Sequence, residues 1–454
     1  MAQILVNFKN RIIKMSPFKA IALIFLGLII LGSFLLSLPI SIKEGQSNFL
    51  DALFTATSAT CVTGLIVADT YQHWTFFGQI VILLLIQLGG LGFMTMATLF
   101  SIMVGRRITL KERILMTESF NQLNMEGIVR LTLHVLMGTF ILEFLGAVIL
   151  STQFIPQYGV LGGIYRGIFH SVSAFCNAGF DILGDKSPYC SLTDYISNPV
   201  VNLTIMALII TGGLGFGVWE DIITQKSYKK LRLHSKMVLI ISFILIIAGT
   251  LGTLLFEYNN AATLKNLNFP DKILASLFHS VSMRTAGFNT LSVGFFKDST
   301  KLLSVILMFI GGSPGSTAGG IKTTTVGVVI FTVHSLLKGK NDVNILERRI
   351  GFNTIIRAFS IFIIGLISII IGSFIIMAFD NYSFMDVLFE TTSAFGTVGV
   401  TTGITSLLSP ASKIALIFLM FFGRVGVLTI GLALLLPGKN NSNIRYPEGK
   451  ISVG

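Results

Sequence analysis

The stretch Phe54-Thr55-Ala56-Thr57-Ser58-Ala59-Thr60-Cys61-Val62-Thr63-Gly64 recurs in altered form three more times along the chain. Each copy begins with the pattern Phe-x-small-(Thr or Val)-Ser, and a glycine follows the phenylalanine after nine or ten residues. The copies start at Phe54, Phe169, Phe278 and Phe389, and their glycines are Gly64, Gly179, Gly287 and Gly399. Four similar units in one chain predict a pseudo-fourfold assembly around a central axis.

The chain of 454 residues is strongly apolar: 52% of its residues are hydrophobic, 12% are charged, and the mean hydropathy is +0.80. So little polar surface cannot coat soluble domains, which predicts an integral membrane protein. Three cysteines (Cys61, Cys176 and Cys190) are too few for a disulfide framework, and the chain has no charged low-complexity block. A disulfide-rich secreted scaffold, a coiled coil and a disordered chain are therefore excluded.

The distribution of positive charges indicates the membrane topology of the chain rather than nucleic-acid binding. The formal net charge is +12, but the basic residues lie in short runs between apolar stretches. About two thirds of them fall into five clusters: Lys9–Lys19, Arg106–Arg130, Lys226–Lys236, Lys338–Arg357 and Lys439–Lys450. Cytoplasmic loops carry such an excess, so we expect these clusters and both termini in the cytoplasm. The first apolar run, residues 20–38, is long enough to span and lacks a signal-peptide cleavage site.

Between these clusters the same three segments recur four times in the same order. Each copy has an apolar segment, a shorter segment rich in Ser, Thr and Gly, and a second apolar segment. The first apolar segments cover residues 20–38, 131–155, 237–257 and 354–379, and the second cover 75–104, 198–218, 302–336 and 413–436. Each is about 20 residues or longer, which a helix needs to cross a membrane. The semi-polar segments are too short to cross twice, so we expect each to descend as a short helix and return extended.

The predicted fold is therefore an all-α membrane protein with eight transmembrane helices and four re-entrant pore helices around a central pore. Each repeat comprises a span, a pore hairpin and a second span. The expected units are residues 1–105, 106–235, 236–340 and 341–437, followed by a cytoplasmic tail at 438–454.

Extended backbone at membrane depth needs partners, because an unpaired carbonyl there costs several kcal/mol. Four such stretches on one axis can turn their carbonyl oxygens toward a cation, since their side chains are small and a glycine accepts positive φ. None contains a carboxylate, which favours a monovalent ion over a divalent one. The candidate filter residues are Cys61, Val62, Thr63, Gly64, Cys176, Asn177, Ala178, Gly179, Thr285, Ala286, Gly287, Thr397, Val398 and Gly399.

These hairpins, with their single filter glycines and flanking spans, resemble the Trk/Ktr/HKT superfamily of potassium transporters, and within it the KtrB-type membrane subunit. The resemblance covers residues 15–454. It implies a potassium filter lined by the four glycines, and Gly64 matches the position where serine is associated with sodium permeation. It further implies potassium uptake across a bacterial cell membrane, a homodimer with one pore per subunit, and regulation by a cytosolic ring that binds the nucleotide itself. No covalently bound cofactor is expected, and sodium dependence stays open.

A glycine-rich run interrupts the second apolar segment of the third unit and is the candidate gate. Its glycines and Pro314 end any continuous helix, and a polar loop below the filter can obstruct the ion path. We hypothesise that Arg424, which is costly within a span unless paired, donates to carbonyls of this loop and holds it closed, with Lys322 as a weaker anchor. The loop residues are Gly311, Gly312, Ser313, Pro314, Gly315, Ser316, Thr317, Ala318, Gly319 and Gly320.

Several alternatives remain. A tightly coupled sodium- or proton-driven cation transporter is the second function, although two-span parallel repeats do not suggest its usual inverted symmetry. An enzyme is disfavoured because no nucleophile, base and metal ligands converge within the spans. Glu143 and His134 share a helix face, where we favour a structural hydrogen bond over a proton relay. The stretches Arg106–Arg113, Lys226–Lys236 and Lys439–Gly454 suit either the ring or anionic lipid.

Overall fold

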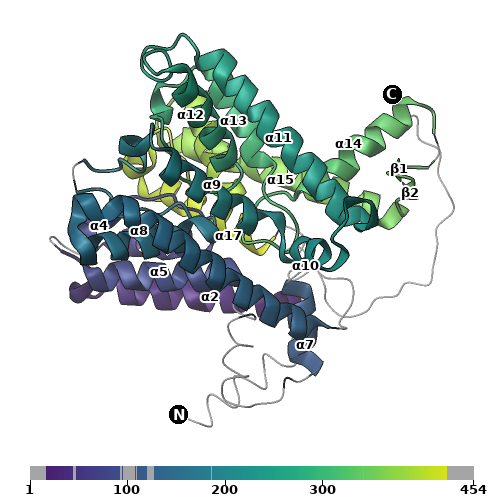
Figure 1. Ribbon diagram of the computed structural model, residues 1–454, viewed down its shortest axis with the longest axis horizontal. Coiled ribbons are helices and arrows are strands. Elements are labelled where there is room, and N and C mark those ends of the chain that lie inside the picture. The colour runs from purple at the N-terminus through teal and green to yellow at the C-terminus, as the bar shows by residue number, and fades with distance from the viewer. Residues whose placement is uncertain are drawn as a thin grey trace.

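The computed structural model describes residues 17–43, 48–92, 95, 108, 110–119, 127–185, 187–340 and 342–426. Four of its helices are long and apolar enough to cross a membrane: α2 (Pro17–Leu36), α8 (Ile128–Phe175), α11 (Leu233–Glu257) and α15 (Phe352–Phe379). They coincide with the four predicted first segments. The expectation of a helical membrane protein with several apolar helices is confirmed (Figure 1).

Each long helix is followed by a short, buried helix that carries the repeated phenylalanine. We call these four the hairpin helices: α3 (Phe49–Thr60), residues 160–175 of α8, α12 (Phe269–Ser282) and α16 (Phe384–Gly396). In α8 the separation from the long helix is made by Gly159, whose φ of 72° breaks the helical geometry. Side-chain caps start two of the others: Asn48 accepts from the backbone N–H of Leu50, and Ser383 accepts from that of Asp386.

Three of the second apolar segments form shorter helices than predicted. The helices α5 (Phe76–Leu91), α9 (Pro199–Leu214) and α17 (Pro410–Val425) have 16 residues each. Each ends at a glycine with φ between 79° and 95°, which an α-helix cannot contain. The predicted spans 75–104, 198–218 and 413–436 were therefore too long as continuous helices. These glycines are Gly92, Gly215 and Gly426.

In the third unit, the second apolar segment is broken at the glycine-rich run, as predicted. Helix α13 (Asp298–Phe309) stops at Ile310, and α14 (Thr323–Leu337) starts beyond Lys322. Between them, residues 310–322 form no helix, and Ile310 pairs with Ile321 in an isolated bridge. The loop therefore leaves and returns at nearly the same place.

Shorter elements complete the described chain. The helix α10 (Phe216–Gln225) leaves α9 at an angle of 93°, and α4 (Thr70–His73) and α7 (Leu110–Ser119) are separate. Strands β1 (Asn344–Ile345) and β2 (Arg348–Arg349) pair antiparallel. Figure 1 shows α7, α10, β1 and β2 at one end of the molecule and α4 at the other. The 3-10 turns are η1 (Pro39–Ser41), η2 (Thr193–Tyr195), η3 (Tyr228–Lys230), η4 (Val293–Phe295) and η5 (Thr405–Leu407).

Other glycines of the second segments permit close packing against the hairpin helices. A Cβ on Gly89 would lie 1.9 Å from the carbonyl oxygen of Thr60, and one on Gly423 would lie 1.9 Å from that of Phe395. In the second unit, a Cβ on Gly212 would lie 2.0 Å from the Phe175 oxygen. Only a residue without Cβ fits there, so these glycines permit the close contact between helices.

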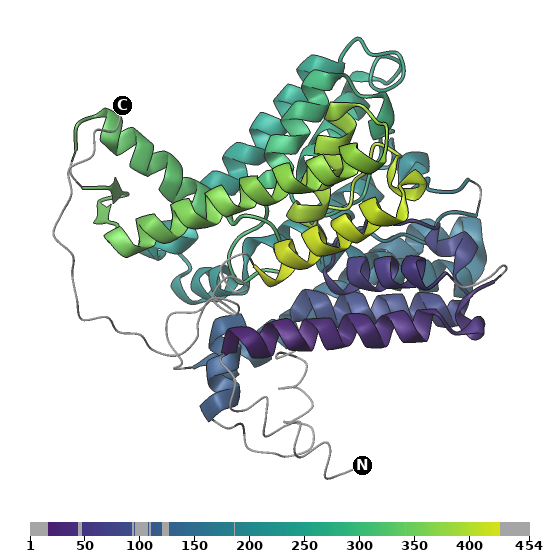
Figure 2. The same ribbon diagram turned by 180° about the vertical axis from the view of Figure 1, so that it is seen from behind.

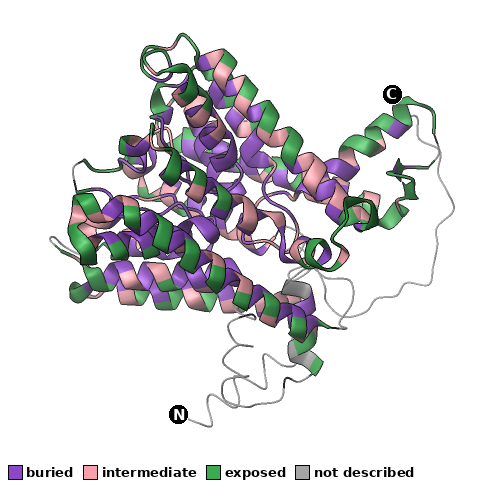
Figure 3. Ribbon diagram, viewed as in Figure 1, coloured by how far each residue is buried: buried purple, intermediate pink, exposed green. Residues whose placement is uncertain are grey.

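The outer faces of the long helices are apolar, as expected for a protein surrounded by lipid. The four repeated phenylalanines are fully buried, and buried residues fill the centre of the assembly (Figure 3). On the outer faces of the long helices, Phe144, Leu255 and Phe374 are 68%, 73% and 70% exposed. Figure 2 shows α15 and α17 on the side hidden in Figure 1. Such extensive apolar exposure indicates contact with a bilayer.

Candidate ion-permeation site

The structure brings the four predicted filter glycines together in a closed series of contacts. A Cβ on Gly64 would lie 3.2 Å from the Cα of Gly179, and one on Gly179 would lie 2.5 Å from the Cα of Gly287. A Cβ on Gly287 would meet the Val398 carbonyl oxygen at 2.8 Å. A Cβ on Gly399 would lie 2.8 Å from the Cα of Gly64, which closes the series. Residues more than 300 positions apart thus meet backbone to backbone.

Two backbone positions in every hairpin have left-handed geometry. All four filter glycines have positive φ, between 68° and 92°. The residue two positions before each glycine also has positive φ, although it carries a side chain. These residues are Val62, Asn177, Thr285 and Thr397, with φ between 52° and 71°. Valine and threonine rarely adopt this conformation, and it costs about 1–3 kcal/mol where it occurs. The sequence pattern indicated the glycines but gave no sign of these second strained positions.

The serine of the repeated motif ties each strained segment to its hairpin helix. In the first and fourth hairpins, the hydroxyl oxygens of Ser58 and Ser393 accept from the N–H groups of Gly64 and Gly399, at 3.0 and 3.1 Å. In the second and third hairpins the serine hydroxyl instead donates to the carbonyl oxygen directly after the glycine. These pairs are Ser173 with Phe180 and Ser282 with Phe288. The motif serine therefore holds the backbone of the candidate filter segment in all four copies.

The residue after the repeated phenylalanine packs behind the filter. His170 contacts the carbonyl oxygen of Arg166 at 2.7 Å, and His279 contacts the hydroxyl of Ser304 at 2.9 Å. Glu390, the counterpart in the fourth unit, is fully buried. Its carboxylate accepts from the backbone N–H of Thr402 and from neighbouring threonine hydroxyls, so it holds the segment that follows the fourth filter glycine.

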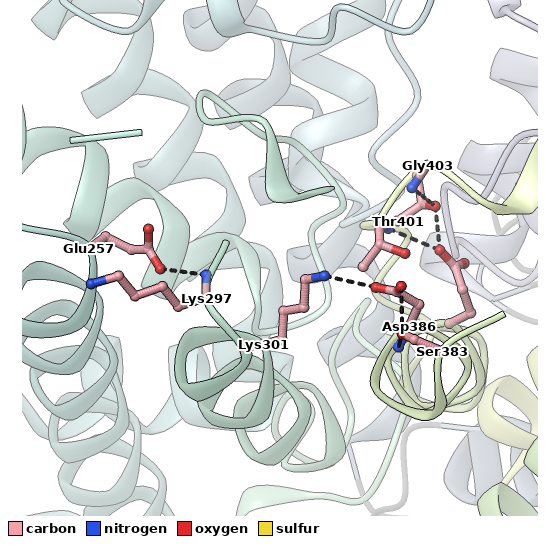
Figure 4. A network of polar contacts seen from close by, with 9 residues as sticks. Glu257, Lys297, Lys301, Ser383, Asp386, Thr401 and Gly403 are labelled. Carbon is pink, nitrogen blue, oxygen red and sulfur yellow. Dashed lines mark hydrogen bonds and ion pairs between the residues drawn. The ribbon is translucent and has the colours of Figure 1, made fainter. Parts of the chain in front are cut away.

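Partly buried ion pairs join neighbouring units near the starts of α13 and α16. Lys301 donates to Asp386 at 2.8 Å, and their side chains are 10% and 23% exposed (Figure 4). Burial alone would raise the pKa of Asp386, but hydrogen bonds from Lys301 and Ser383 hold it below its usual range. Lys413 of α17 pairs with Asp51 of α3 in the same way, at 3.0 Å. Each pair links a second segment to the next hairpin helix.

The candidate gate loop rests on the junction between α9 and α10. The N–H of Ser313 donates to the Gly213 oxygen at 3.0 Å, and the N–H of Thr317 donates to the Gly212 oxygen at 3.2 Å. In the opposite direction, the N–H of Phe216 donates to the Gly315 oxygen at 2.8 Å. Three backbone hydrogen bonds therefore join the loop of the third unit to the helix end of the second.

Two cationic side chains donate to carbonyl oxygens of this loop. The guanidinium of Arg424 donates to the oxygen of Thr317 and also to those of Gly89 and Gly90, the latter at 2.9 Å. The ammonium of Lys322 donates to Ala318 and Gly319 at 2.7 and 3.3 Å. Arg424 thus connects the loop to the end of α5, whereas Lys322 closes the loop on itself.

The carboxylate of Glu143 lies behind the second hairpin. It accepts from the amide of Gln87 at 3.1 Å, and the thiol of Cys176 lies 3.9 Å from it. This is the structural hydrogen bond that we favoured, although its partner is Gln87 rather than His134. Within the described part of the chain, no three His, Cys, Asp or Glu side chains gather as a metal site.

These features define a class: a helical membrane protein in which four strained hairpins meet, with a glycine-rich loop packed beneath them. Comparison with protein families gives the identity more narrowly. The model of the TrkH family, described as cation transport protein, matches residues 17–444, and the chain belongs to this family. Its members are membrane transporters of cations and not enzymes.

Characterised relatives cover nearly the whole chain. It is 41% identical to Ktr system potassium uptake protein B of Bacillus subtilis, over 98% of this chain and 99% of that one. It is 39% identical to the potassium/sodium uptake protein NtpJ of Enterococcus hirae, with the same coverage. The crystal structure of the potassium transporter TrkH from Vibrio parahaemolyticus has a similar fold, with a TM-score of 0.72, 18% identity, and coverage of 93% of this chain and 86% of that one.

Proposed function

We propose that this protein takes up potassium across a bacterial cell membrane by conducting it through the ring of four filter segments. The observation that carries the proposal is the closed series of contacts from Gly64 through Gly179, Gly287 and Gly399 back to Gly64. Carbonyl oxygens around such a point can replace the water of a monovalent cation. The names of the relatives in Bacillus and Enterococcus support potassium, and the second leaves sodium as a further ion.

The four units 1–105, 106–235, 236–340 and 341–437 each contribute one filter segment in this proposal. Each unit comprises a first span, a hairpin helix and a second span, giving eight crossings with both termini cytoplasmic. The glycine breaks of the second spans lie below the filter, where the third unit supplies the loop 311–322. The termini, residues 1–16 and 427–454, lie outside the described residues.

The loop 311–322 is the gate, and Arg424 is its latch. A guanidinium that bridges Thr317 to Gly89 and Gly90 fixes the loop against a helix end that does not belong to its own unit. Its positive charge also lies below the filter, where it repels a cation that leaves. Opening then requires the loop to exchange these donors for water. We further propose a homodimer with one pore per subunit and a cytosolic partner ring that binds the regulatory nucleotide.

The test is rubidium or potassium flux into vesicles that contain the purified protein. Conduction predicts flux driven by the potassium gradient alone, without a sodium or proton gradient, whereas strict dependence on either gradient would establish the coupled transporter instead. Arg424→Gln should raise the flux because the latch is lost. Arg424→Lys keeps the charge but not the planar set of donors, so it should give an intermediate flux. Unchanged flux in a folded Arg424→Gln protein would refute the latch.

A further inference from the structure

The surface beyond the bend at Gly215 lies at the level of the membrane boundary. The 16 residues of α9 extend about 24 Å, so a helix that starts at one face of a hydrocarbon core of about 30 Å ends roughly 6 Å inside the other face. This is the depth of an interfacial helix, about 5–10 Å. Helix α10 then departs at 93°, so it lies across the direction of the span. Figure 1 shows it at the same end of the molecule as α7 and the β1–β2 pair. Of the basic clusters that we assign to the cytoplasm, Lys226–Lys236 and Lys338–Arg357 fall among the described residues and lie at this end (Figure 1). Helix α10 therefore has the position of an interfacial helix.

This surface combines exposed apolar side chains with positive charge. Ile223 on α10 is 70% exposed, and Tyr228 just beyond it is 53% exposed. Helix α10 also carries two acidic residues. Glu220 is exposed, whereas Asp221 is buried and accepts from the backbone N–H of Arg232 and the hydroxyl of Ser235, so Asp221 offers little negative charge to the outside. We call α10 with residues 226–236 the basic interfacial surface. Its basic residues are Lys226, Lys229, Lys230, Arg232 and Lys236.

Most of these charges have no carboxylate near them in the described part of the chain. Only Arg232 lies within 4.0 Å of one, with its Nε 3.8 Å from Asp221, and its side chain remains 77% exposed. Lys226 ends α10 in the left-handed conformation, with φ of 52°, where glycine is the usual residue. A lysine at such a position keeps a charge at the helix end despite a backbone cost of about 1–2 kcal/mol.

We propose that the basic interfacial surface binds headgroups of anionic phospholipids in the cytoplasmic leaflet. Apolar side chains beside a group of lysines at the membrane boundary match a lipid that offers both acyl chain and negative headgroup. A soluble partner ring could bind the positive charges, but it would not account for the exposed Ile223 at the level of the lipid acyl chains. The negative lipid headgroup is therefore the better complement.

Lipid binding reaches the candidate gate through α10, a step that rests on the proposed function. Phe216 is the first residue of α10, and its N–H donates to Gly315 of the loop. The residues just before the bend, Gly212 and Gly213, accept from the loop as well. A headgroup that draws α10 toward the bilayer pulls on these three hydrogen bonds, so flux should rise with the anionic lipid content.

The test uses the full-length protein with three lysines changed together: Lys226→Gly, Lys229→Gln and Lys230→Gln. Glycine suits the left-handed backbone at position 226, so the triple variant should fold. The control is Lys265→Gln with Lys297→Gln, two exposed lysines next to α12 and α13, away from the bend. The first readout is binding of a labelled short-chain phosphatidylglycerol to the protein in neutral detergent. The second is rubidium flux in vesicles of increasing phosphatidylglycerol content.

Each lysine removed should weaken binding about fivefold, or roughly a hundredfold for the triple variant, while the control binds like the wild type. Wild-type flux should increase with phosphatidylglycerol, and flux of the triple variant should stay at its value in neutral lipid. Equal binding by triple variant and wild type would overturn the proposal, as would an equal loss in the control. A defect seen only after adding a cytosolic partner would assign the surface to protein docking. Since binding is measured without transport, absence of flux in every lipid would refute the proposed function alone.

Discussion

Replacing Gly399 by alanine should block conduction, whereas replacing Gly403 by alanine should not. Both glycines have φ near +100°, at 92° and 105°, so an added Cβ strains each backbone by about 1–2 kcal/mol. The surroundings differ. A Cβ on Gly399 would lie 2.0 Å from the carbonyl oxygen of Thr63, but one on Gly403 has no atom within 4 Å. The pair therefore separates backbone strain from damage to the filter.

The size of the effect follows from that contact. Ordinary contact begins at 3.4 Å, so the alanine methyl or the Thr63 carbonyl has to move by about 1.4 Å. A carbonyl displaced that far no longer faces the ion as its neighbours do. Losing one polar contact to a charged partner costs about 1.5–3 kcal/mol. If the whole of this free energy is added to the barrier to permeation, the flux falls roughly 10- to 150-fold.

The assay is rubidium uptake by vesicles, with growth of a potassium-uptake-deficient strain at low potassium as a second readout. Thermal unfolding in detergent gives the stability of each variant. We expect Gly399→Ala to melt below Gly403→Ala because only its Cβ overlaps a neighbouring carbonyl. Per folded protein, we expect nearly normal flux for Gly403→Ala and strongly reduced flux for Gly399→Ala. If Gly399→Ala transports as well as Gly403→Ala, the ring of glycines does not line the ion path.

Three further substitutions test other contacts. Ser393→Ala leaves the buried N–H of Gly399 without its acceptor, so it should cost about 1–3 kcal/mol of stability and lower rubidium flux, while Ser360→Ala, on an exposed face, should change neither. Lys301→Ala should lower the free energy of unfolding by about 1–3 kcal/mol. In a double-mutant cycle, adding Asp386→Asn to Lys301→Ala should cost little more, because the first change has already broken the ion pair. Because the pKa of Asp386 is lowered in the folded state, the pair stabilises the protein above its unfolded pKa of about 3.8, and unfolding against pH should show this contribution lost as the pH falls further. Gly89→Ala should overpack the contact with Thr60 and cost about 1–3 kcal/mol in thermal unfolding, in contrast to Gly27→Ala, where the Cβ meets nothing within 4 Å.

The sequence was most informative where chemistry requires a particular residue. The filter glycines repeat because the backbone there has positive φ and a Cβ has no room, and both causes act on residue type. The break at residues 310–322 was also predictable from the sequence, since one proline and five glycines disfavour a helix there.

Prediction failed where one residue type serves two purposes. Gly89 and Gly92 are neighbours in one glycine cluster, but Gly89 packs inside α5 against Thr60, whereas Gly92 ends the helix. The sequence remains apolar beyond Gly92, so we predicted a single span over residues 75–104.

The repeated serine explains how a strained filter can persist. Left-handed Val62 and Thr397 would relax toward ordinary backbone unless surrounding contacts fixed the segments that contain them. The motif serine supplies two such contacts in the first and fourth hairpins. Its carbonyl oxygen accepts from the residue after the strained one, at 2.8 Å, and its hydroxyl accepts from the filter glycine. In the first and fourth hairpins, the end of the hairpin helix thus fixes the segments that we propose as the filter.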